Sequence, residues 1–544
     1  MKYSYQLFLL CFLLLAGCKQ EQKDFVTTDF YATELFKDVQ LQAVFKDSKT
    51  FVDLVPDRPY AELAAMYEAE KTAASFSLED FVLTHFSDKF NSGQVIVTDT
   101  TKNMYEHISS MWGKLTRGPD TPVENSSRIA LPFKYVVPGG RFREIYYWDS
   151  YFTIEGLLVD DQNELAKSMV DNFSFLIDSL GFIPNGTRNY YLTRSQPPFY
   201  ALMVDAICRD DPEMFSEYFP YILKEYEFWM AGKKDVKGIY TPDKYVVRVG
   251  EDLFMNRYWD SGTTPRPESY KEDFHLASEL SSSKEKTTLY TNMRSGAASG
   301  WDFSSRWYTR ENDFGSTKTA DILAVDLNCL LYFMEKSIAK GYALNEDAEN
   351  QELFLSKAEE RKTSIVKLFW KADDNYFYDY NYQQKDHART PTLAGAFPLF
   401  FELASEEQAK GVRDKLMTNF LKDGGLVTTL EHSGQQWDAP NGWAPLQYMA
   451  VQGLLNYGYV EEAKTIMQRW LALNERVYKD TGKMMEKYNV EDISLLSGGG
   501  EYETQDGFGW TNGVALVFKK SLDDMEIDFI LPPPPKAVID SFEK

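Results

Sequence analysis

The sequence is poor in the residue types that build metal and redox sites. Its 544 residues include only four cysteines and five histidines. No histidine stands at a metal-ligand spacing from another histidine or from a cysteine. We therefore expect neither a metal site nor a cofactor.

Long apolar runs are also missing, with one exception at the N-terminus. Residues 7–15 are apolar and follow a charged start at Lys2, but the run is too short to span a bilayer in the mature chain. It ends Leu15-Ala16-Gly17-Cys18, which resembles the bacterial lipoprotein signal, in which the cysteine is lipidated and becomes the first mature residue. The alternative is an ordinary secretory signal with a chance cysteine. We expect a signal peptide at 1–17, a polar tether at 18–33, and a periplasmic protein that the lipid on Cys18 anchors to a bacterial membrane.

Two cysteines remain for the folded part, because Cys11 leaves with the signal and Cys18 takes the lipid. Cys208 and Cys329 both lie in apolar helical patterns. Such cysteines are by default buried free thiols, and nothing in the sequence supports a disulfide between them.

An excess of basic charge is lacking too, because 58 lysines and arginines face 82 aspartates and glutamates, for a net charge of −24. Nucleic acids and anionic membrane surfaces are bound through basic patches, so neither is an expected partner. No short repeat of the tetratricopeptide kind is visible, which argues against a scaffold of helical repeats. We expect a monomer.

Most of the sequence predicts helices joined by long loops rich in glycine and aromatic residues. Asp160 and Asp161 can cap a helix whose apolar residues recur up to Leu180, and Gly181 ends it. Strand patterns are few, at 245–249 and 376–382. Further helical patterns cover residues 199–208, 212–230, 322–340, 351–370, 393–403, 406–421, 445–457, 461–477 and 511–522.

The predicted helices form hairpins, and the polar loops tend to precede helices. A closed ring of hairpins would gather the N-terminal ends of its inner helices around one mouth, so an all-α toroid is expected, although the helix count also fits an open solenoid. Four prolines at 532–535 cannot continue a helix. We expect a surface tail at 531–544.

The stretch at residues 138–152, PGGRFREIYYWDSYF, mixes charged side chains with aromatic rings. A helix face of a soluble protein would separate the two by periodicity. Flat rings can cover the apolar C–H faces of a sugar ring, and carboxylates and guanidinium groups bind hydroxyls in pairs. The stretch therefore fits a sugar site, and equally a buried aromatic turn with paired charges.

Five further loops share this mixture of residues. The pair Trp-Asp occurs four times, at 148–149, 259–260, 301–302 and 437–438, each time in a loop with glycine or proline. One such pair is chance, but four are hard to attribute to packing. The loops are NGTRNYYLTRSQ (185–196), NRYWDSGTTPRPE (256–268), SGWDFSSRW (299–307), QWDAPNGWAP (436–445) and residues 486–510, from EKY through three glycines to QDGFGW.

PGGRFREIYYWDSYF and QWDAPNGWAP resemble the two signature motifs of the trehalase family of glycoside hydrolases. The loops with RSQ, PRPE, SGWDFSSRW, EKY and GEY…QDGFGWTNG are similar to the family's other motifs, in its order, and LFKDVQ…KTFVDLVP resembles its domain start. The resemblance covers residues 34–530. It implies an (α/α)6 toroid that hydrolyses α,α-trehalose to two glucose molecules with inversion and without a cofactor.

The resemblance also implies roles for individual residues, because this sequence matches the family motifs at each position. The general acid would be Asp302 and the general base Glu486. Substrate contacts would be Arg141, Trp148, Asp149, Asn185, Arg194, Ser195, Gln196, Arg266, Pro267, Glu268, Gly300 and Glu501.

Inverting hydrolysis sets physical requirements for the two carboxyl groups. They must lie on opposite faces of the attacked carbon, roughly 6.5–9.5 Å apart, with a water beside the base. The acid must stay protonated, which burial against aromatic rings and nearby carboxylates favours by raising its pKa. Asp302 lies between Trp301 and Phe303, which suits the acid. Glu486 lies outside the aromatic clusters beside Lys487, which suits an ionised base.

Two other functions fit the residues without the resemblance. A glucoamylase-like α-glycosidase on the same toroid would need an open groove, whereas the long loops at 256–268 and 486–510 favour a closed site for a small disaccharide. A helical sugar-binding lipoprotein of an uptake system would need no pair of carboxyl groups, and a turnover assay separates it from an enzyme. Without the resemblance, the four Trp-Asp aspartates are almost equal candidates for the acid.

The lipid anchor can be tested at the residue that would carry it. We expect Cys18→Ser to move the protein from the membrane fraction to the soluble fraction with its catalytic activity unchanged, because only the acylated thiol would hold it on the bilayer. Fractionation with an activity assay measures both. A Cys18→Ser protein that stays in the membrane fraction would show that the leader works differently.

Overall fold

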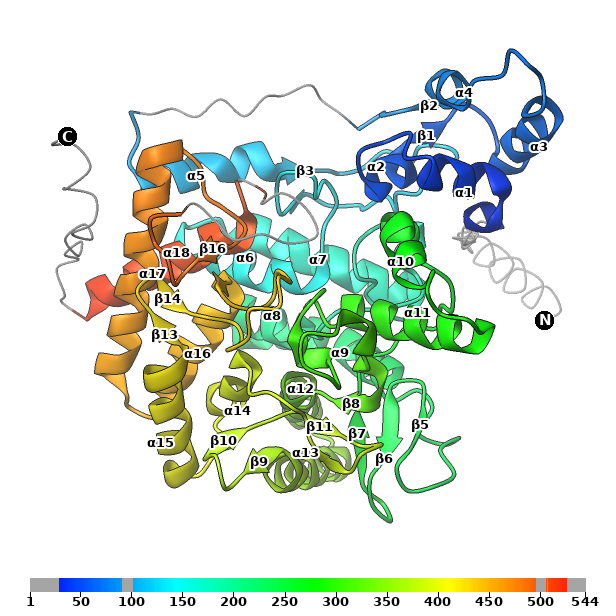
Figure 1. The fold of residues 1–544 in the computed structure, drawn as a ribbon. Helices are drawn as coiled ribbons and strands as arrows, with labels where there is room; N and C mark the ends of the chain where they lie inside the picture. Colours follow the sequence, from blue (N-terminus) through cyan, green and yellow to red (C-terminus); the bar gives the residue numbers. More distant parts are fainter. Residues whose placement is uncertain (1–28, 91–100, 496–504, 506, 526–544) are drawn as a thin grey trace, which may run out of the picture.

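The computed structural model describes residues 29–90, 101–495, 505 and 507–525 of the chain. These residues build a two-layered ring of helices, in which each inner helix contacts the next and α18 contacts α6 (Figure 1). The inner helices are α6 (Tyr147–Val159), α8 (Tyr200–Ile207), α12 (Val325–Leu344), α14 (Phe397–Phe400), α16 (Ala444–Asn456) and α18 (Gly509–Asp524). The outer helices are α5 (Met104–Leu115), α7 (Asn163–Leu180), α9 (Phe215–Trp229), α13 (Ala348–Phe369), α15 (Glu406–Lys415) and α17 (Val460–Thr481). The expected all-α (α/α)6 toroid is confirmed.

The two layers differ in which faces they bury. In α7 the buried residues recur at helical spacing, and the helix ends at Gly181 with φ of 86°, as the sequence predicts. In α6 every residue from Tyr147 to Leu157 is buried, polar ones included, so the helix has no exposed face and gives no periodic signal. The prediction of one loop over residues 138–152 is therefore wrong: the turn is present, but α6 begins at Tyr147.

Two glycines close the ring where its first and last inner helices meet. In Figure 1 the red α18 lies beside the cyan α6. A Cβ atom on Gly156 of α6 would lie 2.2 Å from the Cα of Gly513 of α18. A Cβ on Gly513 would lie 2.0 Å from the backbone oxygen of Phe152. Any side chain at either position would force the helices apart.

Four short α-helices and one single-turn helix near the N-terminus form a unit at the upper right of Figure 1, and its aromatic core also includes Tyr146, Tyr190, Tyr191 and Tyr270 from the rest of the chain. The unit contacts the ring region where α2 meets the turn before α10, and where α1 meets α10. Phe30, only 4% exposed, packs in this core, so the folded part begins earlier than the predicted tether end at residue 33. The unit comprises η1 (Asp29–Ala32), α1 (Glu34–Leu41), α2 (Ser48–Asp53), α3 (Tyr60–Glu70) and α4 (Leu78–His85).

Two further helices, α10 (Tyr270–Leu276) and α11 (Ser283–Ala298), stand between α9 and α12 in the chain and were missed in the sequence. The start of α11 has a capping box, in which the Ser282 side chain accepts from the backbone of Glu285 and the Glu285 side chain accepts from that of Ser282. Single-turn helices are η2 (Asn189–Tyr191), η3 (Pro212–Met214), η4 (Pro267–Ser269), η5 (Ser305–Trp307), η6 (Phe314–Ser316), η7 (Thr319–Asp321), η8 (Leu393–Ala396) and the π-turn η9 (Leu416–Phe420).

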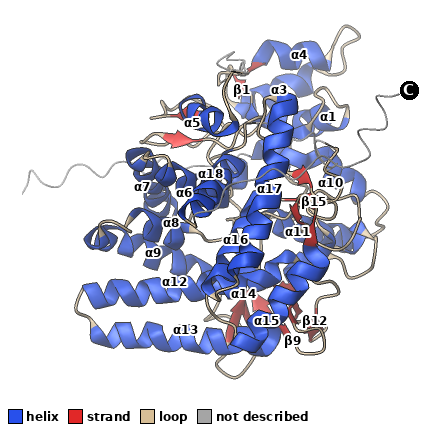
Figure 2. Ribbon diagram, turned by 90° about the vertical axis from the view of Figure 1, so that its left-hand side faces the viewer, coloured by secondary structure: helices blue, strands red, loops and turns tan. Residues whose placement is uncertain are grey.

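The described strands are two or three residues long and tie loops together in small antiparallel sheets (Figure 2). The predicted strand patterns at 245–249 and 376–382 are found as β6 and as β10 with β11. The sheets are β1 (Val55–Pro56) with β2 (Phe86–Ser87); β3 (Thr116–Arg117) with β4 (Tyr135–Val136); β5 (Thr241–Asp243), β6 (Val246–Arg248) and β7 (Phe254–Asn256); β8 (Ile322–Leu323), β11 (Tyr380–Asn381) and β12 (Asp386–His387); β9 (Trp370–Lys371) with β10 (Tyr376–Phe377); β13 (Leu421–Lys422) with β14 (Gly425–Leu426); and β15 (Asn441–Gly442) with β16 (Tyr488–Asn489).

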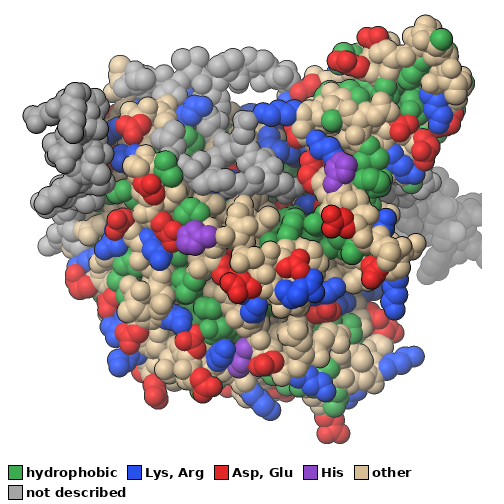
Figure 3. All heavy atoms as spheres, in the orientation of Figure 1, with side chains coloured by type: hydrophobic (Ala, Val, Ile, Leu, Met, Phe, Trp, Pro, Cys, Tyr) green, Lys and Arg blue, Asp and Glu red, His purple; other side chains and the backbone are tan. Residues whose placement is uncertain are grey.

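Several smaller expectations can be compared with the structure. Cys208 and Cys329 are buried free thiols, as expected. Acidic and basic side chains intermingle over the face shown in Figure 3. Among the helices of the described residues, none is long and apolar enough to cross a bilayer. Cys18, the predicted signal at 1–17 and the predicted tail at 531–544 lie outside the described residues.

The glycine contact between α6 and α18 predicts a specific loss of stability. We expect Gly513→Ala to lower the free energy of unfolding by about 1–3 kcal/mol or more, because the added methyl group overlaps backbone atoms. Gly113→Ala is the matched control: Gly113 is an exposed residue inside α5 with nothing within 4 Å of an added Cβ. Alanine there should raise stability by up to about 1 kcal/mol. Thermal denaturation of both variants gives the comparison, and an unchanged Tm for Gly513→Ala would contradict the close crossing.

Candidate active site

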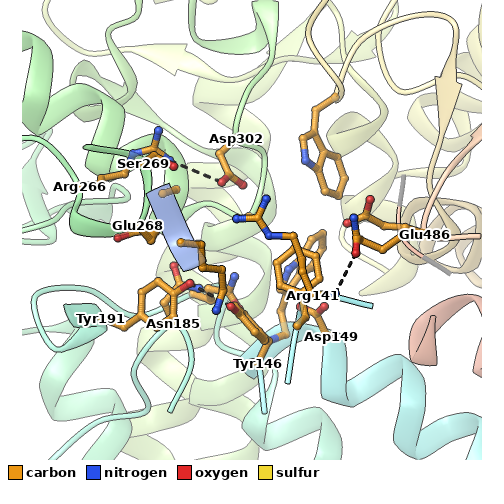
Figure 4. A pocket seen from close by; sticks show the side chains of 18 of the residues that line it. Arg141, Tyr146, Asp149, Asn185, Tyr191, Arg266, Glu268, Ser269, Asp302 and Glu486 are labelled. Atoms are coloured by element: carbon orange, nitrogen blue, oxygen red, sulfur yellow. Dashed lines mark hydrogen bonds and ion pairs between the residues drawn. The ribbon is translucent and has the colours of Figure 1, made fainter. Parts of the chain in front are cut away.

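A cavity of about 840 Å³ opens where the N-terminal ends of the inner helices converge. Its wall comes from segments far apart in the chain, most of which lead into an inner helix or lie between two of them (Figure 4). The structure brings these predicted site residues together in the wall: Arg141, Trp148, Asp149, Asn185, Arg194, Gln196, Arg266, Glu268, Gly300, Asp302 and Glu486.

The loop at residues 138–146 turns sharply so that α6 can begin at the cavity. Gly140 has φ of 55°, and the backbone N–H of Arg141 donates to Oε1 of Gln505 at 2.8 Å. This hydrogen bond joins the start of the first inner helix to the start of the last one. Trp148 and Asp149 then lie in the first turn of α6 and face the cavity.

One side of the cavity is a cluster of tryptophans. The rings of Trp437 and Trp443 stack with centroids 3.8 Å apart and planes 3° apart. Trp148 and Trp510 approach this stack, with centroids 5.7 Å from Trp437 and Trp443 respectively. All four rings line the cavity, and Trp301 stacks behind Trp437 at 5.5 Å. The cluster offers the flat apolar surface that the C–H face of a sugar ring needs.

Another part of the wall is made of paired charges. Nη2 of Arg194 donates to Oε1 of Glu268 at 2.7 Å, and its Nε donates to Oδ1 of Asn185 at 2.8 Å. Burial opposes ionisation of Glu268, but Arg194 and Arg266 outweigh it and hold its pKa below the usual range. Arg266 forms two hydrogen bonds with Asp273, at 3.0 and 2.8 Å. These guanidinium groups are therefore fixed in place before any substrate enters.

The proposed acid and base occupy different surroundings from those expected. The Asp302 side chain is 33% exposed, and its Oδ2 lies 3.8 Å from Nη1 of Arg266. Glu486 is 1% exposed, and its Oε2 lies 3.0 Å from Nζ of Lys487. Nε1 of Trp510 donates to the backbone oxygen of Glu486 at 3.0 Å. The base is thus the more buried of the two and lies against the tryptophan cluster, which its sequence neighbours did not indicate. In Figure 4, Asp302 comes from above and Glu486 from the right.

Asp149 is a third carboxyl group in the cavity. Burial, followed by the nearby charges of Glu486 and Asp302, raises its pKa well above the usual range. No other carboxyl group that lines the described cavity shows this direction of shift among those with a resolved one. Asp149 therefore stays protonated at pH values where an ordinary aspartate is ionised, and its O–H can donate a hydrogen bond.

The aspartates of the four Trp-Asp pairs divide into two that face the cavity and two that hold loops. Asp149 and Asp302 face the cavity. Asp260 is fully buried, with its Oδ2 3.4 Å from Arg194 and 3.5 Å from Arg294. Asp438 accepts hydrogen bonds from hydroxyl and backbone groups of the 304–305 loop at 2.7–2.8 Å. The recurrence of Trp-Asp thus reflects both binding and packing.

Three predicted contacts do not line the described cavity wall. Ser195 is buried and its hydroxyl donates to the backbone oxygen of Ile183 at 2.6 Å. The backbone oxygen of Pro267 accepts from Nε2 of Gln40 at 3.3 Å. Both support neighbours that reach the cavity. Glu501 lies outside the described residues.

The N-terminal unit supplies a part of the wall that the sequence analysis missed. Asp47 caps α2 by accepting from the backbone N–H of Thr50 at 2.9 Å, and it lies 3.5 Å from Nη2 of Arg141. Lys49 lies 2.7 Å from Glu144, and together with Arg188 it lowers the pKa of Glu144 to about 2 in spite of burial. These pairs join the unit to the segment that carries Arg141. The wall residues of this part are Lys46, Asp47, Ser48 and Lys49.

Aromatic and amide residues of the wall were also missed as site residues. Phe142, Tyr146, Trp437, Trp443, Gln505, Phe508 and Trp510 belong to stretches that the sequence singled out, but nothing there showed which rings face inward. Within residues 29–90, 101–495, 505 and 507–525, no group of histidine, cysteine, aspartate and glutamate side chains could hold a metal ion.

Comparison with known proteins places this cavity in a family. The family profile described as Trehalase matches residues 43–523. The periplasmic trehalase of Pseudomonas aeruginosa is 43% identical over 487 residues, which are 89% of this chain and 88% of that protein. Neutral trehalase Nth1 from Saccharomyces cerevisiae has a similar structure, with a TM-score of 0.58, 25% identity, and coverage of 77% of this chain and 79% of that one. Mannosylglycerate hydrolase from Thermus thermophilus shares the fold, with a TM-score of 0.52, 16% identity, and coverage of 77% and 100%.

The raised pKa of Asp149 predicts a pH-dependent effect on stability. In the unfolded chain this carboxyl group loses its proton near pH 3.9, whereas the folded chain retains it, so ionisation increasingly favours unfolding as the pH rises towards the folded-state pKa. Asp149→Asn removes this effect. We expect the unfolding free energy of Asp149→Asn, relative to that of the unsubstituted protein, to increase by up to about 1.4 kcal/mol for each pH unit above pH 4.

Asp260→Asn is the matched control for this experiment. Burial opposes ionisation of Asp260, but Arg294 and Arg194 outweigh it and lower its pKa, so its stabilising contribution is present above the unfolded-state pKa and is lost as the pH falls. Asp260→Asn should therefore be less stable than the unsubstituted protein at neutral pH, with a smaller deficit in acid. Urea denaturation between pH 3 and 7 measures both variants, and a difference for Asp149→Asn that does not change with pH would contradict its assigned protonation.

Proposed function

The chain belongs to the trehalase family of glycoside hydrolases and hydrolyses α,α-trehalose to two glucose molecules with inversion, and we propose that Asp302 is its general acid and Glu486 its general base. The observation that carries this assignment is that both carboxyl groups line one cavity, together with the tryptophan cluster and the paired arginines. The family motifs that contain the two residues support the same roles.

The acid in this proposal protonates the oxygen that joins the two sugars. As the bond from the attacked carbon to this oxygen breaks, Asp302 gives its proton to the oxygen, and the first glucose leaves as a neutral molecule. Arg266, 3.8 Å away, would then compensate the negative charge that appears on Asp302. Arg266 is held by Asp273, so its position would not have to change during the step.

The base in this proposal activates the water. Glu486 takes a proton from a water on the opposite face of the sugar, and the water oxygen forms the new bond to the attacked carbon. The products would be one glucose of inverted and one of retained configuration at the anomeric carbon. Both proton transfers run through carboxyl groups and water, so the proposed steps require no cofactor.

The remaining cavity residues would hold the two sugar rings. The tryptophan cluster would take a C–H face, while Arg194, Asn185 and Glu268 would bind hydroxyls as a preformed set. Asp149 would donate its O–H to a substrate oxygen. Arg141, Trp148, Gln196 and Gly300 would complete the contacts, with Ser195 and Pro267 acting through the backbone around them and Glu501 carried over from the family motif.

The location is proposed from the sequence and the relatives together. The Pseudomonas aeruginosa relative is called periplasmic. We propose that this chain is exported through a signal at 1–17 and that a lipid on Cys18 anchors it to the membrane through the segment after it. The catalytic domain predicted at 34–530 would then also include the single-turn helix η1 (Asp29–Ala32) and be followed by a surface tail at 531–544. We also propose that it acts as a monomer.

The assignment of acid and base predicts two different kinds of failure. The Asp302→Asn enzyme should hydrolyse trehalose poorly but α-glucosyl fluoride much better, because fluoride leaves without a proton. Glu486→Gln should lose activity on both substrates, by about 10²–10⁴-fold, because the water is no longer activated. Steady-state rates with the two substrates measure this.

The matched controls are the two Trp-Asp aspartates that hold loops. Asp260→Asn and Asp438→Asn change carboxylates that hold loops. Neither variant should regain rate when α-glucosyl fluoride replaces trehalose as the substrate. Proton NMR in the first minutes should show β-glucose and α-glucose released together by the unsubstituted enzyme. Release of α-glucose alone would mean retention and would reject both assigned roles.

A further inference from the structure

A chain of buried hydrogen bonds joins the backbone of Asp302 to the carboxylate of Glu486. Nε2 of Gln436 donates to the backbone oxygen of Asp302 at 2.6 Å. Nζ of Lys487 lies 3.3 Å from Oε1 of Gln436 and 3.0 Å from Oε2 of Glu486, and donates to both. Gln436 and Glu486 are 1% exposed and Lys487 is fully buried.

We propose that Gln436 and Lys487 are positioning residues for the reaction: together they set the acid-bearing loop against the base, and Lys487 places a positive charge against the carboxylate that accepts the proton of the water. This inference rests on the roles proposed for Asp302 and Glu486. Neither residue was among the predicted site residues, and Lys487 does not line the cavity described above.

The direction of each hydrogen bond follows from the groups involved. A lysine ammonium group can only donate, and a backbone carbonyl can only accept. The Gln436 amide satisfies both neighbours in one orientation only, with its oxygen towards Lys487 and its nitrogen towards Asp302. Glutamate at this position could not donate to the carbonyl, and lysine could not accept from the ammonium group. The amide is therefore specifically suited to connect these two neighbours.

Gln436 and Lys487 together form a bridge between Asp302 and Glu486, and the backbone around this bridge is fixed from several directions. The backbone oxygen of Gln436 accepts from Nδ2 of Asn441 and from Nε1 of Trp443, both at 3.0 Å. Strands β15 and β16 pair Gly442 with Tyr488, which joins the loop of Gln436 to the loop of Lys487. The bridge thus extends an existing sheet contact to a third loop, which carries Asp302. Small shifts of that loop would change the separation of acid and base, to which a proton-transfer enzyme is sensitive.

The charge of Lys487 has a second effect because the base is buried. A carboxylate removed from water takes up a proton more readily, and an opposite charge nearby reverses that tendency. Nζ of Lys487 lies 3.0 Å from Oε2 of Glu486 and 5.1 Å from the centre of the Trp443 ring, so a positive charge is held directly beside the carboxylate of the base.

The test is the pH dependence of kcat/KM, whose acid limb reports protonation of the base in the unliganded enzyme. For Lys487→Met we expect the acid limb to move to higher pH by about 1–3 units, the usual effect of removing an opposite charge at this range. Lys487→Arg, which keeps the charge, should leave the limb near its original position. Lys415→Met is the matched control, since Lys415 pairs with Asp374 at 2.7 Å on the outer helix α15, and it should change neither the limb nor the rate.

The substrate comparison adds a second readout. Lys487→Met should lose rate on trehalose and on α-glucosyl fluoride alike, because the defect concerns the base and not the leaving group. A Lys487→Met enzyme that is slower at every pH with an unshifted acid limb would overturn the inference and leave Lys487 with a packing role. If Glu486→Gln itself remained active, the assigned base would be wrong, which is a separate outcome.

A second variant covers the case in which Lys487→Met does not fold, as judged by circular dichroism. Gln436→Glu places another carboxylate beside Lys487, where it competes with Glu486 for the ammonium group and cannot donate to the Asp302 backbone oxygen. We expect its acid limb to move upward as well, with a fall in kcat larger than any change in KM. A folded Gln436→Glu enzyme with the original limb and kcat would overturn the bridge.

Discussion

Charged groups that are buried must be paired, and this constraint determines how the catalytic end of the ring is built. A lone buried charge costs several kcal/mol, and each arginine of the wall lies against a carboxylate: Arg141 against Asp47, Arg194 against Glu268 and Arg266 against Asp273. Arg306 shows the pattern at its strongest: it forms hydrogen bonds of 2.7–2.9 Å with Asp326 and Asp379 and stacks between Trp301 and Trp307. The loops before the inner helices are therefore held to one another by charge pairs, and the cavity is rigid without a substrate.

The sequence predicted the fold class and the cavity well where a physical signal was local. Periodic apolar residues and Gly181 were sufficient for α7, and most outer helices followed from similar signals, whereas the predicted cap at Asp160 and Asp161 was wrong because α7 begins after Gln162, whose side chain makes no capping hydrogen bond. The family motifs identified eleven residues that the structure places in the cavity wall. Inner helices such as α6 gave no periodic signal, since a helix buried on all sides has no exposed face.

The parts that could not be predicted depend on contacts between distant residues. Nothing near Asp47 or Lys49 indicates that they reach Arg141 and Glu144. Likewise, a lysine beside a glutamate in a sequence is read as a surface pair, whereas Glu486 and Lys487 are both buried. Of four similar Trp-Asp pairs, two hold loops, and only the three-dimensional arrangement distinguishes Asp260 and Asp438 from Asp149 and Asp302.

The contact between Gly156 and Gly513 has a consequence for how the protein is made. The first inner helix finds its last neighbour only after a segment more than three hundred residues further along has emerged, which is a very long-range contact for a folding chain. Until then the flank of α6 that α18 covers has no partner, and it is open to chaperones or to association with other chains. Since Gln505 and Glu486 also come from this late segment, synthesis must be almost complete before the enzyme can be active.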